Sequence, residues 1–330
     1  MPGCRWSTAR RRCRGRRIDR AQRAVAKSGR SRALAHFDAI RRAGSIRAAA
    51  RGLHISSSAL NRQLLLLEES LGFPLFERLP RGLRLTPGGE IVARHAITVL
   101  QDEARMAAEL DALKGIRRGS VDVATVETLA AGMIPAVLDR LLARHPAVQV
   151  TVRIAGSAAA AGAVVDGDAD IAIAFLRRRT DGLRQVARGR FRVGAVVPPR
   201  HPLAARGSVT FAECARHPLV LPTAELSIHD DLQPLFGSQA RALQVVLATG
   251  SIELAKSLAA RGAGIAFANR FGIAAEAAQA QLRFVPLRPA VHSELGIYVR
   301  AERHLPPAVD ALVRIAADEI ARLETRDGSG

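Results

Sequence analysis

Apolar residues recur every three or four positions between residues 31 and 71, and this spacing predicts three short amphipathic helices. Gly44 and Ser45 follow a first helix from about residue 31 to residue 43, and Ser45 is expected to cap an alanine-rich second helix. A third helix is expected over residues 56–71, with Ser56 at its start. The apolar positions of the first and third helices are Leu34, Phe37, Ile40, Leu60, Leu64, Leu67 and Leu71.

The residues around the third helix indicate binding to double-stranded DNA. Its N-terminal end is short, polar and basic, which suits a helix that enters a major groove. A turn at residues 80–82 then joins two short extended segments, and arginines near such a turn can reach phosphates or a narrow minor groove. The candidate DNA-binding residues are Arg47, Ser57, Ser58, Asn61, Arg62, Arg78, Arg81 and Arg84.

This segment resembles the N-terminal winged helix-turn-helix of the LysR-type transcriptional regulators over about fifty residues without a gap. Helical patterns with surface arginines also occur in small bundles that bind no DNA, and the density of the match favours the regulator. The matching residues are Phe37, Gly44, Ser45, Ala48, Ala49, Ala50, Leu53, Ala59, Leu60, Gln63, Leu67, Glu68, Leu71, Gly72, Leu75, Phe76, Glu77, Arg78, Leu85, Thr86, Pro87 and Gly89.

Four positions depart from the pattern of that family. Ser57 stands where a longer side chain is common, and Asn61 stands where the family often has serine. Asparagine can pair with adenine through two hydrogen bonds, so Asn61 is expected to read a base. Leu65 and Leu66 replace positions that are often basic, which implies either fewer phosphate contacts or contact with another subunit.

A long helix is expected from Thr86 and Pro87 to about Lys114, because threonine caps a helix and proline suits its first turn. Its apolar positions alternate spacings of four and three, interrupted at Glu103, which is typical of a helix–helix seam. The helix could instead pack on its own domain; the resemblance implies a dimerising linker. The seam residues are Val92, Ala96, Val99, Met106, Leu110 and Leu113.

After a hinge at residues 114–119, strand and helix patterns alternate, which favours an α/β fold with a mostly parallel sheet. The resemblance implies an effector domain of two α/β subdomains similar to type II periplasmic binding proteins, crossed by two connections. The expected helices are 129–144, 158–166, 211–215, 232–236, 252–261 and 307–323. The expected strands are 120–126, 148–154, 171–175, 191–197, 219–222, 243–248, 264–268, 282–286 and 295–300.

Ligands of open α/β sheets bind at the carboxyl ends of strands, and polar residues follow several expected strands here. A helix beginning near Leu129 would point backbone N–H groups into the cleft and favour an anionic group, whereas Glu127 favours a ligand that also carries a donor. The candidate effector-binding residues are Thr125, Glu127, Thr128, Pro222, Thr223, Thr249 and Ser251.

The net charge of the chain is weaker evidence for DNA binding than its magnitude suggests. The net charge is +19, but residues 1–32 hold 12 basic residues and one acidic residue, whereas residues 119–330 hold 24 and 20. Residues 1–30 lack the apolar surface to fold alone and are expected to be a disordered extension. Three interpretations of it stay open: a phosphate-binding arm, a transit peptide, or a stretch read from a start codon assigned too far upstream.

Catalysis, metal binding and membrane insertion are not expected. The nine histidines and three cysteines form no metal-binding or nucleophile motif, and no phosphate-binding glycine loop is present, so we expect no enzyme activity, cofactor or metal. Cys4, Cys13 and Cys214 leave one thiol in the globular part, which argues against a disulfide-based redox sensor. No apolar run approaches the roughly 18 residues that a membrane span needs, so we expect a cytoplasmic protein.

The sequence therefore predicts a ligand-responsive transcriptional regulator whose partners are promoter DNA, a small-molecule effector, other copies of itself as a dimer and then a tetramer, and RNA polymerase if it activates. The alternative is a solute-binding receptor without DNA function, in which the N-terminal helices serve as an anchor. The expected domains are a basic extension (1–30), a winged helix-turn-helix (31–87), a linker helix (86–114), an effector domain (119–323) and a C-terminal tail (324–330).

Overall fold

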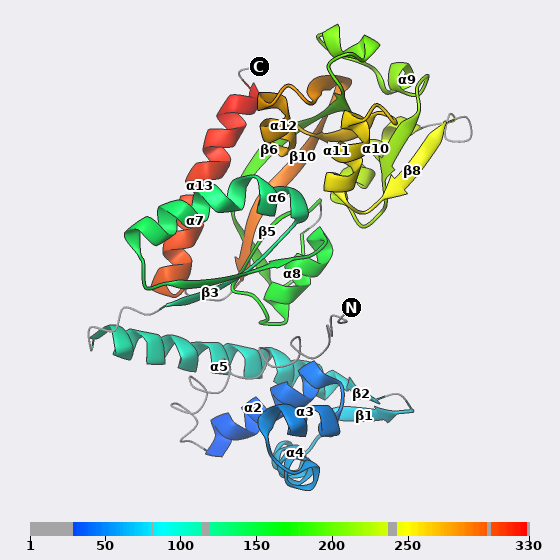
Figure 1. Cartoon of the computed structure of the whole chain (residues 1–330). Helices are drawn as coiled ribbons and strands as arrows, with labels where there is room; N and C mark the ends of the chain where they lie inside the picture. The colour runs from blue at the N-terminus through cyan, green and yellow to red at the C-terminus, as the bar shows by residue number, and fades with distance from the viewer. Residues whose placement is uncertain are drawn as a thin grey trace, which may run out of the picture. The chain divides into compact units, whose positions relative to one another are not determined.

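The computed structural model describes residues 29–80, 82–113, 119–177, 179–236, 243–301 and 305–328. The chain divides into two compact units, Met1–Arg118 and Gly119–Gly330, which are described separately here (Figure 1). Three sequence predictions fall outside the described residues: most of the basic extension, Arg81 in the wing, and the hinge at residues 114–118. The side chain of Leu113 is outside the description as well.

The N-terminal unit is a winged helix-turn-helix followed by a long helix. The helices begin and end within three residues of the bounds expected from apolar spacing. Phe37, Ile40, Leu60 and Leu75 are fully or almost fully buried and form the centre of the core. The elements are α2 (Gly29–Ala43), α3 (Ile46–Leu53), α4 (Ser57–Leu71), β1 (Phe76–Leu79), β2 (Gly82–Leu85) and α5 (Pro87–Leu113).

Two of the three expected helix caps form. The Ser56 hydroxyl accepts a hydrogen bond from the backbone N–H of Ala59 at 3.1 Å, and the Thr86 hydroxyl accepts one from Gly89 at 2.9 Å. Each bond satisfies an N–H group of a first turn that has no partner within the helix. Ser45 stands at the cap position of α3, but its side chain makes no capping hydrogen bond, so that prediction is wrong.

The wing is fixed to the helices by backbone hydrogen bonds and one carboxylate. Leu83 N–H donates to the Gly44 carbonyl at 3.0 Å, and the Glu68 carboxylate accepts from Leu75 N–H at 2.7 Å. Gly82 has a φ of 134°, and a Cβ there would lie 2.9 Å from the Gly44 carbonyl oxygen. Glycine at position 82 therefore permits both the turn and the close approach of the wing to the α2–α3 corner.

The linker helix α5 has two halves with different environments. Val92 and Val99 pack against the core of the winged helix, and Ala96 is 0% exposed there. A side chain without exposed surface cannot contact another subunit, so the predicted seam position is wrong for Ala96, which packs within its own domain. Met106 and Leu110, by contrast, are 50% and 49% exposed.

The C-terminal unit is built on a six-stranded sheet with the order β4-β3-β5-β10-β6-β9. The expectation of a mostly parallel sheet is wrong. Strand β3 runs parallel to β4 and β5, but β10 runs antiparallel to both β5 and β6, and β6 runs antiparallel to β9. The strands are β3 (Ser120–Thr125), β4 (Gln149–Ile154), β5 (Ile171–Phe175), β6 (Leu183–Val197), β9 (Ala266–Asn269) and β10 (Arg283–Arg300).

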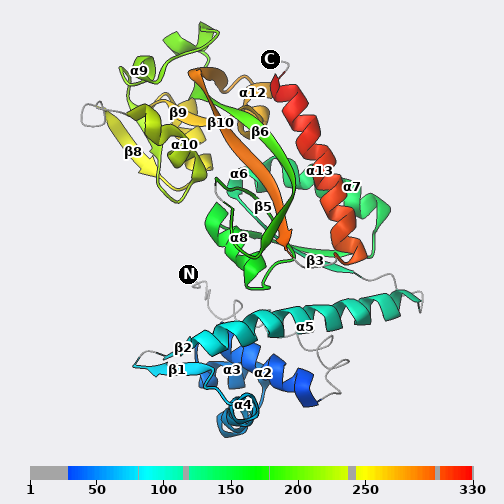
Figure 2. The same cartoon turned by 180° about the vertical axis from the view of Figure 1, so that it is seen from behind.

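The two longest strands, β6 and β10, run through both lobes of the unit, as the green and orange arrows show in Figures 1 and 2. They are the two connections that the resemblance implied, and they pair along most of their length. Sequence pattern recognised only the end of β6 and divided β10 into two strands. The division fell on the exposed residues Arg288 to Ala290, where the register of the pair also shifts.

The first lobe has helices on both faces of its strands. Helices α7 and α13 cover one face and α8 covers the other, and the core between them is one cluster of buried residues (Figure 2). The helix expected from Leu129 to Arg144 is interrupted at Gly132. The helices of this lobe are α6 (Glu127–Ala131), α7 (Met133–Arg144), α8 (Ser157–Val165) and α13 (Pro307–Gly328).

The second lobe contains a small parallel sheet of β7 (Leu219–Pro222) and β8 (Val245–Thr249). Buried apolar residues of this lobe form two further clusters. Three short elements, η1, η3 and α12, were not expected from sequence. The helices of this lobe are η1 (Pro202–Ala205), α9 (Phe211–Cys214), α10 (Ser227–Phe236), α11 (Ile252–Ala260), η3 (Arg270–Ile273) and α12 (Ala274–Ala278).

The last helix continues beyond its expected end. A tail was predicted from residue 324, but α13 runs to Gly328. The Glu324 carboxylate accepts from the backbone N–H of Arg190 at 2.8 Å, and the Asp327 carboxylate accepts from that of Arg192 at 2.7 Å. These side chains hold the last turns against β6. No helix in the described part of the chain has the length and hydropathy of a membrane span.

Candidate DNA-binding surface and effector cleft

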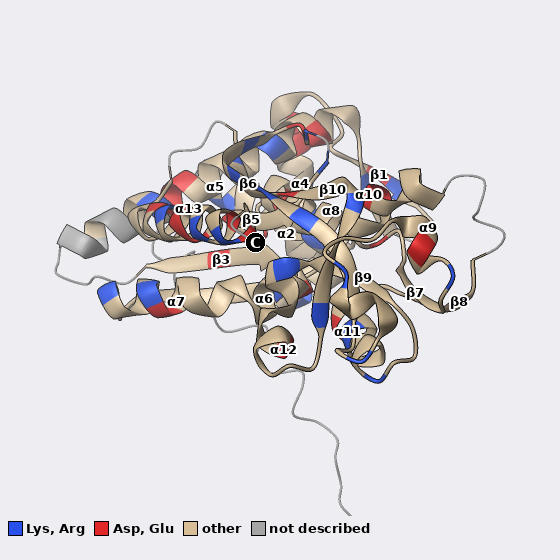
Figure 3. Cartoon of the chain, turned by 90° about the horizontal axis from the view of Figure 1, so that it is seen from above, with Lys and Arg blue, Asp and Glu red and all other residues tan. Residues whose placement is uncertain are grey.

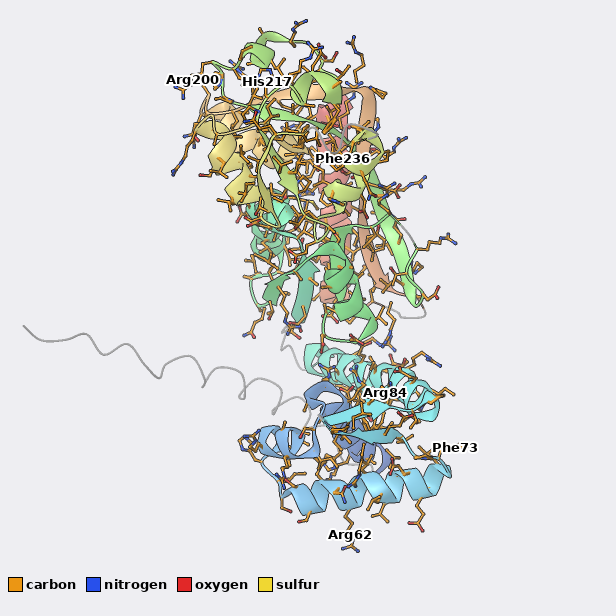
Figure 4. All side chains as sticks on the ribbon, turned by 90° about the vertical axis from the view of Figure 1, so that its right-hand side faces the viewer. Arg62, Phe73, Arg84, Arg200, His217 and Phe236 are labelled. Carbon is orange, nitrogen blue, oxygen red and sulfur yellow. The ribbon has the colours of Figure 1, made fainter. Side chains whose placement is uncertain are left out.

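The N-terminal end of α4 presents polar side chains to solvent. The Ser58 hydroxyl lies 3.2 Å from the Ser56 hydroxyl, within hydrogen-bond distance. Arg62 is exposed and forms no ion pair with any residue that the structure describes, and Figure 4 shows it projecting outward from α4. Ser58 is exposed beside it, whereas Ser57 and Asn61 are half-buried. Leu60, Leu64 and Leu67 anchor the opposite face of the helix in the core. The helix therefore offers one edge of hydrogen-bond donors and acceptors on a rigid support.

The predicted basic residues outside α4 differ in their pairing. Arg47 and Arg78 are exposed and form no ion pair within the described residues. Arg84 instead donates to the Glu77 carboxylate, with Nη2 at 2.7 Å, across the two wing strands. Glu77 and Arg84 are register partners, and Arg78 faces Leu83 on the next pair, so the two arginines project from opposite faces of the wing.

An exposed apolar surface lies beside these groups and was only partly anticipated. Leu65 and Leu66 are about half exposed, and Phe73 and Ile91 are exposed by 66% and 61%. Leu66 and Ile91 line a groove of about 420 Å³ between α4 and α5. Sequence pattern pointed to the two leucines but gave no reason to select Phe73 or Ile91.

The C-terminal unit contains a cavity of about 620 Å³ between its two lobes. The first lobe contributes the ends of β3 and β4 and the start of α8. The second lobe contributes residues 224–228, the loop before α11 and the end of β9. This is the cleft at the carboxyl ends of parallel strands where effector binding was predicted. In the described part of this unit, acidic and basic residues are interspersed on helices such as α7 and α13 (Figure 3).

Two of the seven predicted effector residues, Glu127 and Thr128, line the cavity. The other five do not, for reasons of local packing. The Thr125 side chain is buried and donates to the Ile173 carbonyl at 2.9 Å, and Pro222 is buried in β7. Thr249 accepts from Ser251 N–H at 3.1 Å. Thr223 and Ser251 are close to the cavity in sequence but not among its lining residues.

Glu127 connects the two lobes. Its Oε1 accepts from the Ser251 hydroxyl at 3.0 Å, and its Oε2 accepts from the Ile252 N–H at 2.9 Å. Ser251 also caps α11 by accepting from Leu254 N–H at 3.2 Å. A carboxylate at a helix N-terminus is stabilised by unpaired N–H groups and by the helix dipole. Glu127 of the first lobe therefore satisfies the start of α11 in the second.

A second contact between the lobes lies near the cavity wall. Arg177, which follows β5, pairs with Asp231 of α10 at 3.3 Å. Asp231 also accepts from the hydroxyl of Ser293, a lining residue, at 2.6 Å. Burial raises the pKa of the Asp231 carboxyl, and the Ser293 hydrogen bond and Arg177 oppose that rise. The two contacts together hold the lobes around the cavity.

Several lining residues were missed by sequence reasoning. Gly156 and Ser157 follow β4 in the same way that Glu127 and Thr128 follow β3, so the strand-end rule could have found them. Glu225, Asn269 and Ser293 reach the cavity through long-range packing, and no local pattern marks them. The cavity is therefore assembled mainly by contacts between distant segments.

The single cysteine of the C-terminal unit is not part of this cavity. Cys214 is a buried free thiol, and burial together with the neighbouring Glu213 charge raises its pKa to about 12. The thiolate is the reactive form of cysteine, so this side chain is inert at neutral pH.

Comparison with known protein families agrees with both units. Residues 31–90 match the family described as bacterial regulatory helix-turn-helix protein, lysR family, and residues 114–321 match the LysR substrate binding domain. The chain belongs to the LysR family of transcriptional regulators. The predictions of a regulator and of an α/β effector domain behind a winged helix-turn-helix are thereby confirmed.

Curated relatives of this LysR-type regulator are themselves described as regulators. The chain is 31% identical over 266 residues to an HTH-type transcriptional regulator of Mycobacterium tuberculosis, covering 78% of this chain and 85% of the relative. It is 27% identical over 299 residues to the SDS degradation transcriptional activation protein of a Pseudomonas species, covering 88% and 96%. The family is one of transcriptional regulators, not of enzymes or solute receptors.

Solved LysR-type structures share the fold. A full-length OxyR variant from Pseudomonas aeruginosa is 20% identical with a TM-score of 0.68, covering 88% of this chain and 94% of that one. ArgP from Mycobacterium tuberculosis is 22% identical with a TM-score of 0.66, covering 88% and 96%. At this level of identity the similarity shows a shared fold and does not show a shared ligand.

Proposed function

We propose that this LysR-type regulator reads operator DNA with the N-terminal end of α4 and responds to a small molecule held in the cleft of its C-terminal unit. The observation that carries the DNA assignment is the unpaired Arg62 beside Ser58 and Asn61 on a helix that the domain core holds rigidly. Arg62 and Asn61 have no competing partner within the described residues, so they are available to base edges and phosphates, and the exposed Ser58 hydroxyl shares one hydrogen bond of 3.2 Å with the Ser56 hydroxyl.

The proposed contacts divide into reading and positioning roles. Asn61 suits the two hydrogen bonds that adenine offers in the major groove, and Arg62 suits guanine or a phosphate. Arg47 and Arg78 have the exposure and charge of phosphate contacts, which orient a protein on DNA without reading sequence. Arg84 contributes less because Glu77 already neutralises it.

Self-association is proposed through α5. LysR-type regulators form oligomers, and the exposed apolar residues Ile91, Met106 and Leu110 give this helix a surface that a second copy could cover. We propose a dimer through this helix and a tetramer of two such dimers. We also propose that the protein contacts RNA polymerase at promoters that it activates. We propose that the protein acts in the cytoplasm, where promoter DNA lies.

Effector control is proposed to act through the cleft. A ligand that contacts both lobes changes the population of lobe arrangements in proportion to its difference in affinity for them. Glu127 and Asp231 hold the lobes together through their bonds to Ser251, Ile252 and Arg177, so these contacts belong to one of the arrangements.

The DNA assignment is tested by selecting genomic fragments with the full chain and measuring affinity for the recovered fragment by fluorescence anisotropy. The Arg62→Ala variant should bind it about tenfold more weakly and show a smaller salt dependence, because one cationic contact is lost. Arg184→Ala is the matched control, since Arg184 is an exposed arginine of the C-terminal unit that forms no ion pair with the residues that the structure describes.

Equal losses for Arg62→Ala and Arg184→Ala would show that charge alone, and not the α4 surface, supports binding. If no fragment is enriched over random DNA, the proposal of operator recognition fails. Enrichment with a selective loss for Arg62→Ala supports it.

A further inference from the structure

The cavity between the lobes has an unusual distribution of charge. Among the described residues that line it are two carboxylates, Glu127 and Glu225, and no lysine, arginine or histidine. A cavity of this kind offers no side-chain cation to pair with an anionic effector. The partners of the two carboxylates and of the unpaired backbone groups therefore decide what ligand the cavity accepts.

The two carboxylates are not equivalent. Glu127 is already bound by the Ser251 hydroxyl and the Ile252 N–H at the start of α11. Glu225 forms no hydrogen bond and no ion pair with any residue that the structure describes. Its carboxylate lies against Gly250, also a lining residue, where a Cβ would collide with it. Glu225 is thus an unpaired anion at the cavity, and a ligand with a cationic group or a strong hydrogen-bond donor would pair with it.

The start of α8, on the other lobe, has the opposite character. Its cap residue is Gly156, which has no side chain to accept from the first-turn N–H groups, no other side chain in the described part of the chain accepts from them, and that turn contains no acidic residue. Ser157 is 7% exposed, lines the cavity, and its hydroxyl has no partner among the described residues. Unpaired N–H groups, a helix dipole and a buried unpaired hydroxyl together suit an anionic group of a ligand.

These two places face each other at short range. A Cβ on Gly156 would lie 3.2 Å from the Glu225 carbonyl oxygen, so the start of α8 and the loop that carries Glu225 are in near contact across the cleft. The rest of the cavity wall is mainly apolar. Its larger apolar residues are Val126, Ile154, Phe175, Leu226, Ile228 and Ile252.

We infer that the effector is a compact zwitterion of the amino-acid type with an apolar side chain. Its carboxylate binds the start of α8 and the Ser157 hydroxyl, its ammonium group pairs with Glu225, and its side chain lies on the apolar walls. This inference rests on the proposed function of the cleft and adds the chemical class of its ligand. The ligand bridges the lobes, because Ser157 and Glu225 belong to different ones.

Calorimetric titration of the full-length protein tests the inference with L-valine, L-leucine, L-isoleucine, L-methionine and L-phenylalanine. Each amino acid that binds is compared with its deaminated acid and its decarboxylated amine, for leucine 4-methylpentanoate and 3-methylbutylamine. Both analogues should bind at least about tenfold more weakly, because each loses one charge-assisted hydrogen-bonding group.

Two variants assign the charges. Glu225→Gln should weaken the amino acid about tenfold and leave the deaminated acid within about threefold of its wild-type affinity. Ser157→Ala should weaken both the amino acid and the acid several-fold, because it removes a contact to the carboxylate. Asp139→Asn is the matched control and should change neither affinity, because Asp139 is an exposed residue of α7 outside the cavity and has no partner among the described residues.

Three results would overturn the inference: no binding by any of the five amino acids, a deaminated acid that binds as tightly as its parent, or an unchanged amino-acid affinity in Glu225→Gln. Operator affinity is measured on the same preparations. If the operator is bound and any of these three results is obtained, the ligand class is rejected and DNA recognition is not affected. If the wild-type chain does not bind the operator, the proposed function itself is rejected.

Discussion

Helices α4 and α11 both begin with several polar groups, but the two helix starts differ in their hydrogen bonds. Asn61 and Arg62 of α4 have no partner among the described residues, whereas the polar groups at the start of α11 are hydrogen-bonded. On α4, the cap is local: the Ser56 hydroxyl accepts from Ala59 N–H and lies at 3.2 Å, within hydrogen-bond distance, from the Ser58 hydroxyl, while Asn61 and Arg62 project without partners in the described chain. At α11, the local cap from Ser251 is joined by the carboxylate of Glu127, which comes from the other lobe.

The difference separates two kinds of site. A surface that reads DNA keeps its donors and acceptors unpaired, because the nucleic acid supplies their partners. A cleft that changes shape has polar groups that already hold its two sides together, and a ligand must add to or replace those contacts. Polar residues at a helix start therefore indicate a ligand only after their partners within the fold are known.

Removing the Glu127 carboxylate should have the largest effect on stability. Glu127→Ala leaves the Ser251 hydroxyl and the Ile252 N–H without their acceptor, which should lower the free energy of unfolding by about 2 kcal/mol. Urea denaturation of the full chain measures the change. Glu127→Gln keeps one oxygen acceptor and should lose about half as much stability. Equal stability of Glu127→Ala and wild type would show that the Glu127 hydrogen bonds between the lobes do not stabilise the fold.

Asn61→Ala tests the unpaired side of the comparison. Loss of a two-bond contact to a base costs about 1–3 kcal/mol, so operator affinity should fall about tenfold while affinity for random DNA stays the same. Anisotropy titrations with both DNAs measure the difference. A parallel loss on random DNA would mean that Asn61 contacts the backbone and reads no base.

Glu77→Gln should release Arg84 from its ion pair and make it available to DNA. Arg84 is bound to Glu77 at 2.7 Å on the exposed wing, and such surface pairs contribute about 0–1 kcal/mol to stability. Removal of the carboxylate charge should strengthen DNA binding about two- to threefold at low salt with little change in unfolding. Unchanged or weaker DNA binding would place Arg84 away from the DNA.

His201→Asn should have the smallest effect, seen as a change in pH dependence. His201 Nδ1 accepts from Leu203 N–H at 3.2 Å, and burial, followed by the nearby His217, lowers the pKa of His201 below its ordinary 6.5. A lowered histidine pKa means that the unfolded chain binds more protons just below pH 6.5, so stability falls as pH falls through that range.

Asparagine can still accept the hydrogen bond from Leu203 but does not titrate. Melting temperatures of wild type and His201→Asn should therefore agree at pH 8 and differ at pH 5.5, where the wild type loses more. Parallel curves over the whole range would show that protonation of His201 does not matter to the fold.

Sequence predicted local features well and long-range ones poorly. The caps at Ser56 and Thr86, the wing and the bounds of α4 follow from spacing within a few residues. The antiparallel pairing of β10 and the end of α13 depend on partners that are distant in the sequence. Thr125 and Thr249 were predicted to face the ligand, but hydrogen bonds within the fold engage their hydroxyls.

The same limit applies to the linker helix and the cleft. The spacing of Val92, Ala96 and Val99 indicated an apolar face correctly but could not say whether another subunit or the winged helix covers it. Ser157 and Glu225 are ordinary loop residues by sequence. Only the packing of the two lobes shows that one is buried and unpaired and that the other lies against Gly250.

Amide hydrogen exchange in the full-length protein tests the contrast between the two helix starts most directly. The Ile252 N–H is bound by Glu127, whereas the Ser58 N–H lies in the first turn of α4, where no intrahelical acceptor exists. We expect the Ile252 amide to exchange at least about tenfold more slowly than that of Ser58 after correction for intrinsic rates, and to lose this protection in Glu127→Ala. Equal protection of the two amides in the wild type, or protection of Ile252 that survives Glu127→Ala, would contradict the account.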